Sequence, residues 1–226
     1  MGDSWEIEAK ALVKTYKSGE KVIRAVDNIS LDIKRGEFVS IVGHSGSGKT
    51  TLLNLIGGLT RPNSGTVIIN GIDLWSMDDN DLSEFRNRKL SFIFQFFSLI
   101  PTLNATENVL FPMTFRDSKD DFCPDAIKLL DMVGLIDKVD AYPSQLSGGE
   151  QRRVAIARAF INNPEIILAD EPTGDLDEET ETEMMSLFKK MNKDKGITFI
   201  MVTHNLELAG QAERQLRMSN GRLIAL

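Results

Sequence analysis

A short apolar run leads directly into a glycine-rich loop near the start of this chain, and that junction limits the possible folds more than any other feature. Phe38 to Val42 is rich in β-branched and aromatic residues, as expected of a buried strand. The next eight residues, Gly43 to Thr50, read Gly-His-Ser-Gly-Ser-Gly-Lys-Thr. Thr51 to Gly58 then repeats leucine and isoleucine at helical spacing. A strand, a glycine loop and a helix in this order predict an α/β core.

Such a loop is suited to hold phosphate groups. Its glycines let backbone N–H groups point inward, and the following helix adds the positive end of its dipole. Lys49 would reach the β- and γ-phosphates of ATP, and Thr50 would offer a hydroxyl to Mg²⁺. A flexible glycine turn is the plainer alternative, but a chance match is expected in roughly one chain of this length per hundred. We therefore predict ATP binding by Gly43, His44, Ser45, Gly46, Ser47, Gly48, Lys49, Thr50 and Thr51.

Two adjacent carboxylates follow a second apolar run, Ile166 to Ala169. Ligands of α/β sheets bind at such strand ends. Asp170 would hold Mg²⁺ through water, and Glu171 would polarise the water that attacks the phosphate. An acidic helix cap after a core strand is the plainer alternative, and the phosphate loop upstream favours the functional interpretation.

Composition narrows the class of protein further. The 226 residues suit one domain with an inserted subdomain, and 42% of them are hydrophobic, enough for a substantial core. The net charge of -7 argues against general attraction to nucleic acid or anionic lipid. The first ten residues are acidic and lack the layout of a secretory signal. Polar residues and prolines interrupt Leu90 to Phe115, the most apolar stretch, so we expect any membrane role to come through a partner.

The remaining patterns divide the chain into three parts. Short apolar and polar stretches alternate over Glu6 to Ile33, as expected of antiparallel strands. The pattern becomes helical and more charged over Asp79 to Gly134. Ile166 to Ala169, a helix from Glu178 to Met191, and Thr198 to Val202 have the spacing of a βαβ unit. We expect a parallel sheet on both sides of a helical insertion.

A second glycine-rich segment settles the resemblance to a known family. Leu146-Ser147-Gly148-Gly149-Glu150-Gln151 precedes an amphipathic helix, which a plain N-cap at Ser147 could also explain. With the phosphate loop upstream and four apolar residues before Asp170-Glu171 downstream, this order resembles the ATP-binding cassette family. The resemblance spans Trp5 to Leu226, nearly the whole chain.

The resemblance implies a fold and further site residues. The fold is α/β, a P-loop NTPase (RecA-like) core over residues 1–78 and 159–226 with an antiparallel β subdomain, and a helical subdomain over residues 79–158. Tyr16 is similar to the aromatic residue that stacks on adenine. Gln95 resembles the glutamine that contacts Mg²⁺ and the lytic water and senses a membrane partner. His204 resembles the histidine that bonds the γ-phosphate, and we place it with Glu171 and Gln95 as catalytic.

The same resemblance implies a site shared by two copies. ATP on one copy would be covered by the signature segment of the other, which is Leu146, Ser147, Gly148, Gly149 and Glu150. A crossing loop would be formed by Asp175, Leu176 and Asp177. ATP binding would close the homodimer and hydrolysis would open it. The metal ligands would be Thr50, Gln95 and Asp170, with ATP and Mg²⁺ as the cofactors.

The expected function is ATP hydrolysis that drives an integral membrane permease subunit, with the chain peripheral on the cytoplasmic face of the membrane. Ile93-Phe94-Gln95 and Thr106-Glu107-Asn108-Val109 are similar to the lipoprotein-release and macrolide-export branch. One alternative is a soluble cassette ATPase that acts on DNA or ribosomes, but the chain has one cassette and no sustained heptads. A small-molecule kinase would lack the signature segment.

Overall fold

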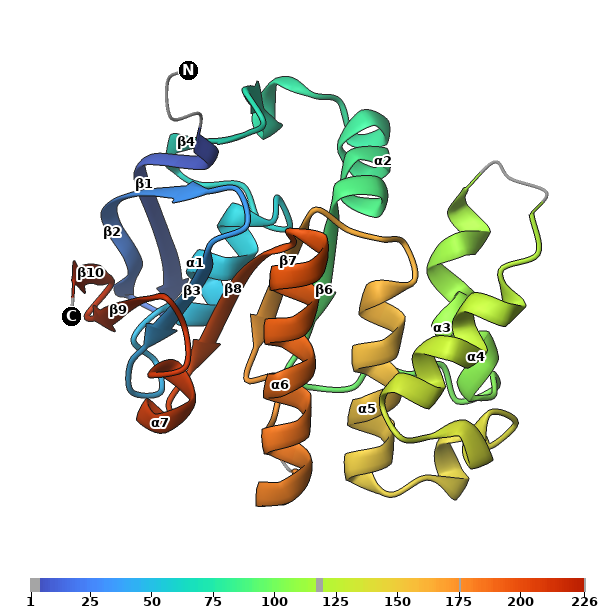
Figure 1. The fold of residues 1–226 in the computed structure, drawn as a ribbon. Helices are drawn as coiled ribbons and strands as arrows, with labels where there is room; N and C mark the ends of the chain where they lie inside the picture. The colour runs from blue at the N-terminus through green and yellow to red at the C-terminus, as the bar shows by residue number, and fades with distance from the viewer. Residues whose placement is uncertain (1–4, 117–119, 175, 226) are drawn as a thin grey trace.

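Two sheets organise the computed structural model, which describes residues 5–116, 120–174 and 176–225 (Figure 1). The larger sheet has six strands in the order β10-β9-β3-β8-β7-β6. Its neighbours from β9 to β6 are parallel, and only β10 pairs antiparallel. Its strands are β3 (Phe38–Val42), β6 (Leu90–Ile93), β7 (Ile166–Asp170), β8 (Thr198–Thr203), β9 (Arg214–Ser219) and β10 (Arg222–Ala225).

The smaller sheet is antiparallel and has the order β2-β1-β4-β5. It consists of β1 (Trp5–Ser18), β2 (Lys21–Lys34), β4 (Ser64–Ile69) and β5 (Ile72–Asp73). The turn at Gly19, with φ of 60°, joins β1 to β2, and their pairing confirms the antiparallel strands predicted for this part of the chain. Buried side chains of both sheets and of α1 form one hydrophobic cluster, so the antiparallel sheet packs on the parallel core.

Seven α-helices complete the described part of the chain, together with four short 3-10 helices. The α-helices are α1 (Lys49–Ile56), α2 (Asp79–Lys89), α3 (Ala105–Leu110), α4 (Cys123–Met132), α5 (Gly148–Phe160), α6 (Glu178–Lys195) and α7 (Leu206–Ala209). The 3-10 helices are Leu74–Ser76, Phe111–Phe115, Ile136–Lys138 and Pro143–Gln145. α3, α4 and α5 pack together on one side of the larger sheet (Figure 1).

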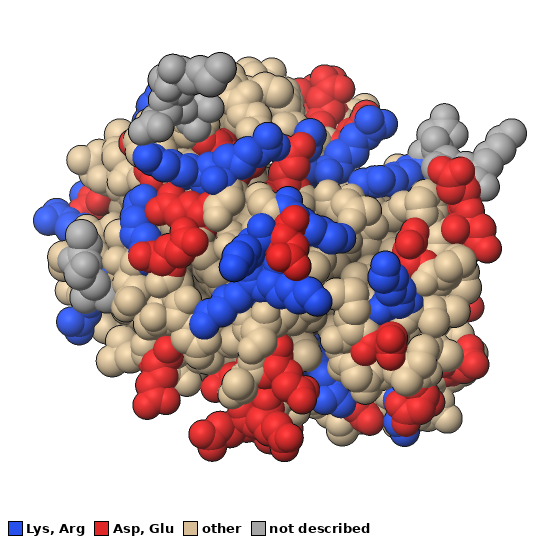
Figure 2. Space-filling view, in the orientation of Figure 1, with Lys and Arg blue, Asp and Glu red and all other residues tan. Residues whose placement is uncertain are grey.

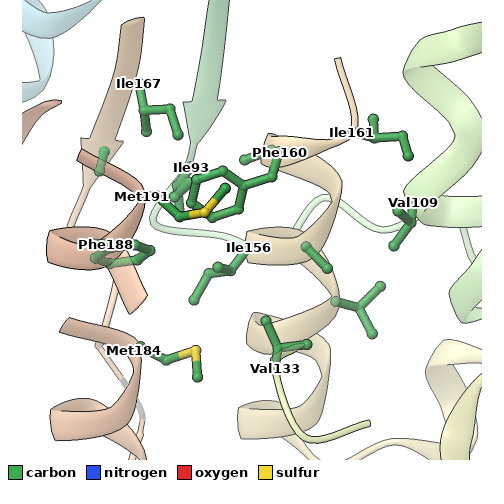
Figure 3. Close-up of a cluster of buried hydrophobic side chains, with 14 of the residues drawn as sticks. Ile93, Val109, Val133, Ile156, Phe160, Ile161, Ile167, Met184, Phe188 and Met191 are labelled. Atoms are coloured by element: carbon green, nitrogen blue, oxygen red, sulfur yellow. The ribbon is translucent and has the colours of Figure 1, made fainter. Parts of the chain in front are cut away.

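A second hydrophobic cluster joins this helical group to the larger sheet. Figure 3 shows Phe160 and Ile156 of α5 between α6, represented by Phe188, and the smaller helices, represented by Val109. Ile167 of β7 belongs to the same cluster. Helix α5 therefore ties the helical group to the strand that ends at the two carboxylates.

The structure corrects the helical interpretation of residues 79–134 in one place. Leu90–Ile93 is a strand, β6, at the edge of the parallel sheet, paired with β7. Leu90 and Ile93 are buried, but four residues are too few to display strand periodicity against charged helix on one side and prolines on the other. Strands β9 and β10 also lay outside the sequence interpretation. The division of the chain at residues 79 and 158 stays a prediction.

Candidate active site

The glycine loop lies where the sequence placed it, between β3 and α1. Gly46 and Gly48 have φ of 76° and 107°, a region that residues with a side chain rarely adopt. A Cβ on Gly48 would lie 2.1 Å from the carbonyl oxygen of Ala25, so the close approach of β2 also requires glycine there. Gly48 is the N-cap of α1 and supplies no side-chain cap, which leaves the first N–H groups of the helix available to an anion.

The loop also holds two polar side chains in unusual surroundings. Lys49 is 8% exposed. Its Nζ atom donates to the carbonyl oxygens of Gly43 at 2.6 Å and His44 at 3.3 Å. The hydroxyl of Ser47 is buried and has no hydrogen-bond partner among the described residues. A lysine folded over its own loop and a buried unpaired hydroxyl can both turn to a phosphate oxygen.

Asp170 is the last residue of β7 and is buried. Burial raises the pKa of its carboxyl above the ordinary value. A hydrogen bond with Thr50 and the charge of Lys49 oppose that rise. The neighbouring charge of Glu171 adds to it. Asp170 therefore lies in a site where a bound cation would relieve an unfavourable burial of charge.

Glu171 follows in a left-handed conformation, with φ of 47°, which is costly for a residue with a side chain. Its N–H donates to the Val202 carbonyl at 2.9 Å, and its own carbonyl accepts from the Arg152 guanidinium at 3.2 Å. The carboxylate accepts from the Thr203 hydroxyl at 3.0 Å and contacts Nδ1 of His204 at 3.0 Å. Contacts from β8 and α5 therefore fix a strained residue beside the loop.

These groups surround a cleft of about 800 Å³. It contains most of the predicted residues, namely Tyr16, His44, Ser45, Gly46, Ser47, Gly48, Lys49, Thr50, Thr51, Gln95, Asp170, Glu171 and His204. Gly43 lies at the start of the loop and accepts from Lys49, without lining the cleft. The arrangement can bind a polyphosphate, hold a cation beside it and place a carboxylate next to both.

The signature segment, residues 146–150, does not line this cleft. Ser147 caps α5, and Glu150 completes the capping box by accepting the Ser147 N–H at 2.7 Å. That hydrogen bond lowers the pKa of Glu150 and keeps it ionised. A Cβ on Gly149 would lie 3.5 Å from the Leu176 side chain, so the signature segment adjoins the predicted crossing loop. Asp177 caps α6 through the Thr180 N–H, and Asp175 lies outside the described residues.

Sequence reasoning missed two residues that line the cleft, Ala25 and Arg152, and it assigned a third lining residue, Gly174, to the crossing loop. Arg152 is 1% exposed, and its guanidinium donates to the carbonyls of Phe94 at 3.1 Å and Glu171 at 3.2 Å. The guanidinium also lies 4.9 Å from the centroid of the Phe97 ring. A signal existed, because Arg152 shares the buried face of α5 with Ile156, four residues further along.

The comparisons with known proteins agree with this geometry. The family model described as "ABC transporter" matches residues 26–174. The uncharacterized ABC transporter ATP-binding protein MJ0796 of Methanocaldococcus jannaschii is 47% identical over 96% of this chain and 94% of that protein. The lipoprotein-releasing system ATP-binding protein LolD of Bordetella pertussis is 44% identical over 96% of this chain and 94% of its own length.

A longer relative and a solved structure extend the comparison. The macrolide export ATP-binding/permease protein MacB of Rhodopirellula baltica is 44% identical over 95% of this chain, which spans only 32% of that protein. A dimeric structure of MJ0796 in a post-hydrolysis state, bound to ADP and Pi, superposes with a TM-score of 0.93 and covers 97% of this chain and 98% of that one.

The chain belongs to the ABC transporter family, and it is an ATPase of that family. Its fold is that of the ATP-binding cassette. Across the residues that the structure describes, none of the helices combines the length and the apolar character needed to cross a membrane.

Proposed function

We propose that two copies of this chain close head to tail around two Mg-ATP molecules and drive a membrane-embedded permease subunit. One observation carries the proposal. The cleft of a single chain holds the phosphate loop, the carboxylates and His204, whereas the signature segment lies outside it. A second copy that faces the first would supply the signature segment to the open side of each cleft.

ATP would bind along the loop with its phosphates on the N–H groups of Gly46 to Thr50 at the uncapped start of α1. Lys49 would exchange the carbonyls of Gly43 and His44 for the β- and γ-phosphates. Tyr16, 44% exposed at the edge of the cleft, would stack on the adenine ring.

The oxygen atoms beside the loop fit Mg²⁺, which prefers hard oxygen ligands and retains several waters. Thr50 would contribute its hydroxyl, Asp170 would act through water and Gln95 would contribute its amide oxygen. When bound, the ion would neutralise charge on the phosphates. Burial raises the pKa of the Asp170 carboxyl, and a bound cation would offset the cost of burying its charge.

Glu171 would orient the attacking water and accept its proton, and His204 would bond the γ-phosphate. In the structure these two side chains contact each other at 3.0 Å, and the His204 side chain is 76% exposed. His204 can therefore leave Glu171 for the phosphate at small cost. In the closed pair, residues 146–150 and the crossing loop at Asp175 to Asp177 would cover the nucleotide of the opposite copy.

A permease subunit would dock on the side of the cleft that contains Gln95. A hollow of about 500 Å³ there is lined by Gln95 together with Phe96, Phe97 and Leu99. Of these side chains, Phe96 is 79% exposed. Two relatives carry names that refer to macrolide export and lipoprotein release, and these names support a location of this chain on the cytoplasmic side of a membrane. The transported substrate would be selected by the permease.

The central test is Glu171→Gln with saturating ATP. Binding groups are untouched and one negative charge next to the γ-phosphate is removed, so the closed dimer should persist and appear by light scattering. Hydrolysis should fall by on the order of 10²- to 10⁴-fold, because a general base is lost. Adding Ser147→Arg should abolish the dimer, since a bulky cation would occupy the place of the opposite nucleotide. A monomer at saturating ATP would rule out the head-to-tail arrangement.

Docking has its own test, because Phe97 contacts the Arg152 guanidinium while Phe96 points into solvent. Phe96→Asp and Phe97→Asp should each reduce copurification with the membrane partner from a mild detergent extract. Phe96→Asp should leave ATP hydrolysis by the isolated chain unchanged, which makes it the cleaner variant. Unchanged copurification in both would refute docking at this surface.

A further inference from the structure

Thr203 occupies a position at the active site that neither the motifs nor the proposed roles explain. It is the last residue of β8, is 1% exposed, and lies directly before His204. Its hydroxyl accepts the Asn205 N–H at 3.0 Å and donates to Oε2 of Glu171 at 3.0 Å. Because the backbone N–H faces the hydroxyl oxygen, the hydroxyl proton is left to point at the carboxylate.

We propose that Thr203 is a positioning residue that holds the Glu171 carboxylate in its working orientation throughout the ATPase cycle. The inference rests on the proposed role of Glu171. Glu171 lies beyond the end of β7 and in a left-handed conformation, so its side-chain direction depends on partners outside its own strand. Among the described residues, Thr203 and His204 contact its carboxylate.

The two partners differ in how permanent they are. His204 has an exposed side chain, and the proposed function requires it to turn to the γ-phosphate. Thr203 is fixed by the β-sheet, where it pairs with Val42, and by the turn that its hydroxyl makes with Asn205. When His204 leaves, Thr203 still holds one carboxylate oxygen of Glu171, and the oxygen that His204 released can accept from water.

The same strand offers a matched control at its other end. Thr198, the first residue of β8, is 0% exposed. Its hydroxyl accepts the Gly36 N–H at 2.7 Å and donates to the Glu6 carboxylate, so the two threonines make the same pair of contacts. Thr198 is not among the residues that line the cleft. Thr198→Val therefore removes a hydroxyl from the same strand without touching Glu171.

The experiment compares kcat and KM of ATP hydrolysis, together with the Kd of ADP, in Thr203→Val, Thr203→Ser and Thr198→Val. Valine keeps the branched shape that a buried strand position needs. Thr203→Val should lower kcat by about 10- to 100-fold, the loss expected when a catalytic group is misplaced by about 1 Å. The KM and the Kd should stay within about twofold, and Thr203→Ser should recover most of the rate. Thr198→Val should lower thermal stability and leave kcat near that of the unmodified chain.

A double-mutant cycle with Glu171→Gln then separates positioning from general damage, using single-turnover conversion of ATP. If Thr203 acts through Glu171, Thr203→Val should slow Glu171→Gln by less than about twofold. If Thr203→Val slowed the Glu171→Gln variant as much as it slows the unmodified chain, the proposal would be overturned. An unchanged kcat in Thr203→Val alone would also overturn it. If Glu171→Gln alone hydrolysed at the normal rate, the proposed role of Glu171 would fail first, and the two failures are thereby distinguished.

Discussion

The two ends of the parallel sheet use the same kinds of residue for opposite purposes. Where the strands begin, Glu165 is paired with Lys89 and with Arg35 at 3.2 Å, and Arg35 also contacts the buried Glu6 at 3.4 Å. Where they end, Asp170 forms no ion pair among the described residues. Lys and Arg side chains lie next to Asp and Glu side chains in several places on the face drawn in Figure 2. At the first end of the sheet the carboxylates likewise lie beside partly exposed basic side chains, whereas at the other end they face a cleft. The difference separates what stabilises the fold from what is available to a ligand.

The pKa directions express the same contrast. Burial alone would raise the pKa of Glu165, but the hydrogen bond and charge of Lys89, aided by Asn70 and Arg35, lower it below the ordinary value. Burial raises the pKa of Asp170, and the smaller opposing contributions of Thr50 and Lys49 do not cancel it. The folded chain therefore stabilises the ionised form of Glu165 but not that of Asp170.

The largest expected effect distinguishes the two lysines at these ends. Lys49→Ala removes the cation of the phosphate loop, so ATP hydrolysis should fall by at least about 10²- to 10³-fold and ATP affinity should collapse while the circular dichroism spectrum is kept. Lys89→Ala removes a partly exposed ion pair with Glu165 and should cost at most about 1 kcal/mol of unfolding free energy, with little change in hydrolysis. A near-normal rate in Lys49→Ala would refute the assignment of the loop.

The sequence was sufficient for the phosphate loop, the strand that carries Asp170 and the hairpin of β1 and β2, because each is encoded by residues adjacent in the chain. It was not sufficient for β6, whose four residues pair with a strand more than seventy positions away. Arg152 and Thr203 were missed for a related reason. Their importance arises from contacts with Glu171 that only the folded arrangement of α5, β7 and β8 creates.

A second prediction removes one carboxylate from each end. Asp170→Asn should lower Mg²⁺-dependent hydrolysis by about 10²-fold, because the site loses the charge that would hold the ion through water. Excess chelator should abolish hydrolysis by the unmodified chain in the same assay. Glu165→Gln should leave the rate within about twofold. If the two substitutions slowed hydrolysis equally, the separation between the two ends would be wrong.

The third prediction is that Glu165→Gln and Asp170→Asn change the unfolding free energy of the nucleotide-free chain in opposite directions. The folded pKa of Glu165 is below its unfolded value of 4.5, so its stabilisation is present above pH 4.5 and is lost as pH falls through the folded pKa. The folded pKa of Asp170 is above 3.8, so its contribution is present below pH 3.8 and is lost as pH rises through the folded pKa.

Near pH 7, Glu165→Gln should therefore be destabilised by up to about 1 kcal/mol. Asp170→Asn should be as stable as the unmodified chain or more stable by a similar amount. Both differences should shrink as the pH approaches about 3.5. Urea unfolding at the two pH values measures them, and a destabilised Asp170→Asn at neutral pH would contradict the interpretation of the cleft as a place of unrelieved charge.

The smallest expected effect belongs to Glu6, a strongly buried carboxylate at the end where the parallel strands begin. Its pKa is raised by burial and by the charge of Glu165, against the lowering effect of the Thr198 hydrogen bond and Arg35. Its contribution to stability is therefore present below pH 4.5 and lost as pH rises through the raised folded pKa. Glu6→Gln removes this dependence. As the pH rises from about 4 to about 7, the unfolding free energy of the variant should therefore increase relative to that of the unmodified chain.

The net change at pH 7 should stay within about 0.5 kcal/mol, because the removed burial penalty offsets the lost contact with the exposed Arg35. The amide oxygen can still accept from Thr198, which keeps β1 joined to β8. Urea unfolding at about pH 4 and about pH 7 measures the stability. The kcat should not change, because Glu6 contacts Thr198, which is at the opposite end of β8 from Thr203. A lowered kcat in Glu6→Gln would mean that the two ends of the sheet are coupled, and the comparison would have to be given up.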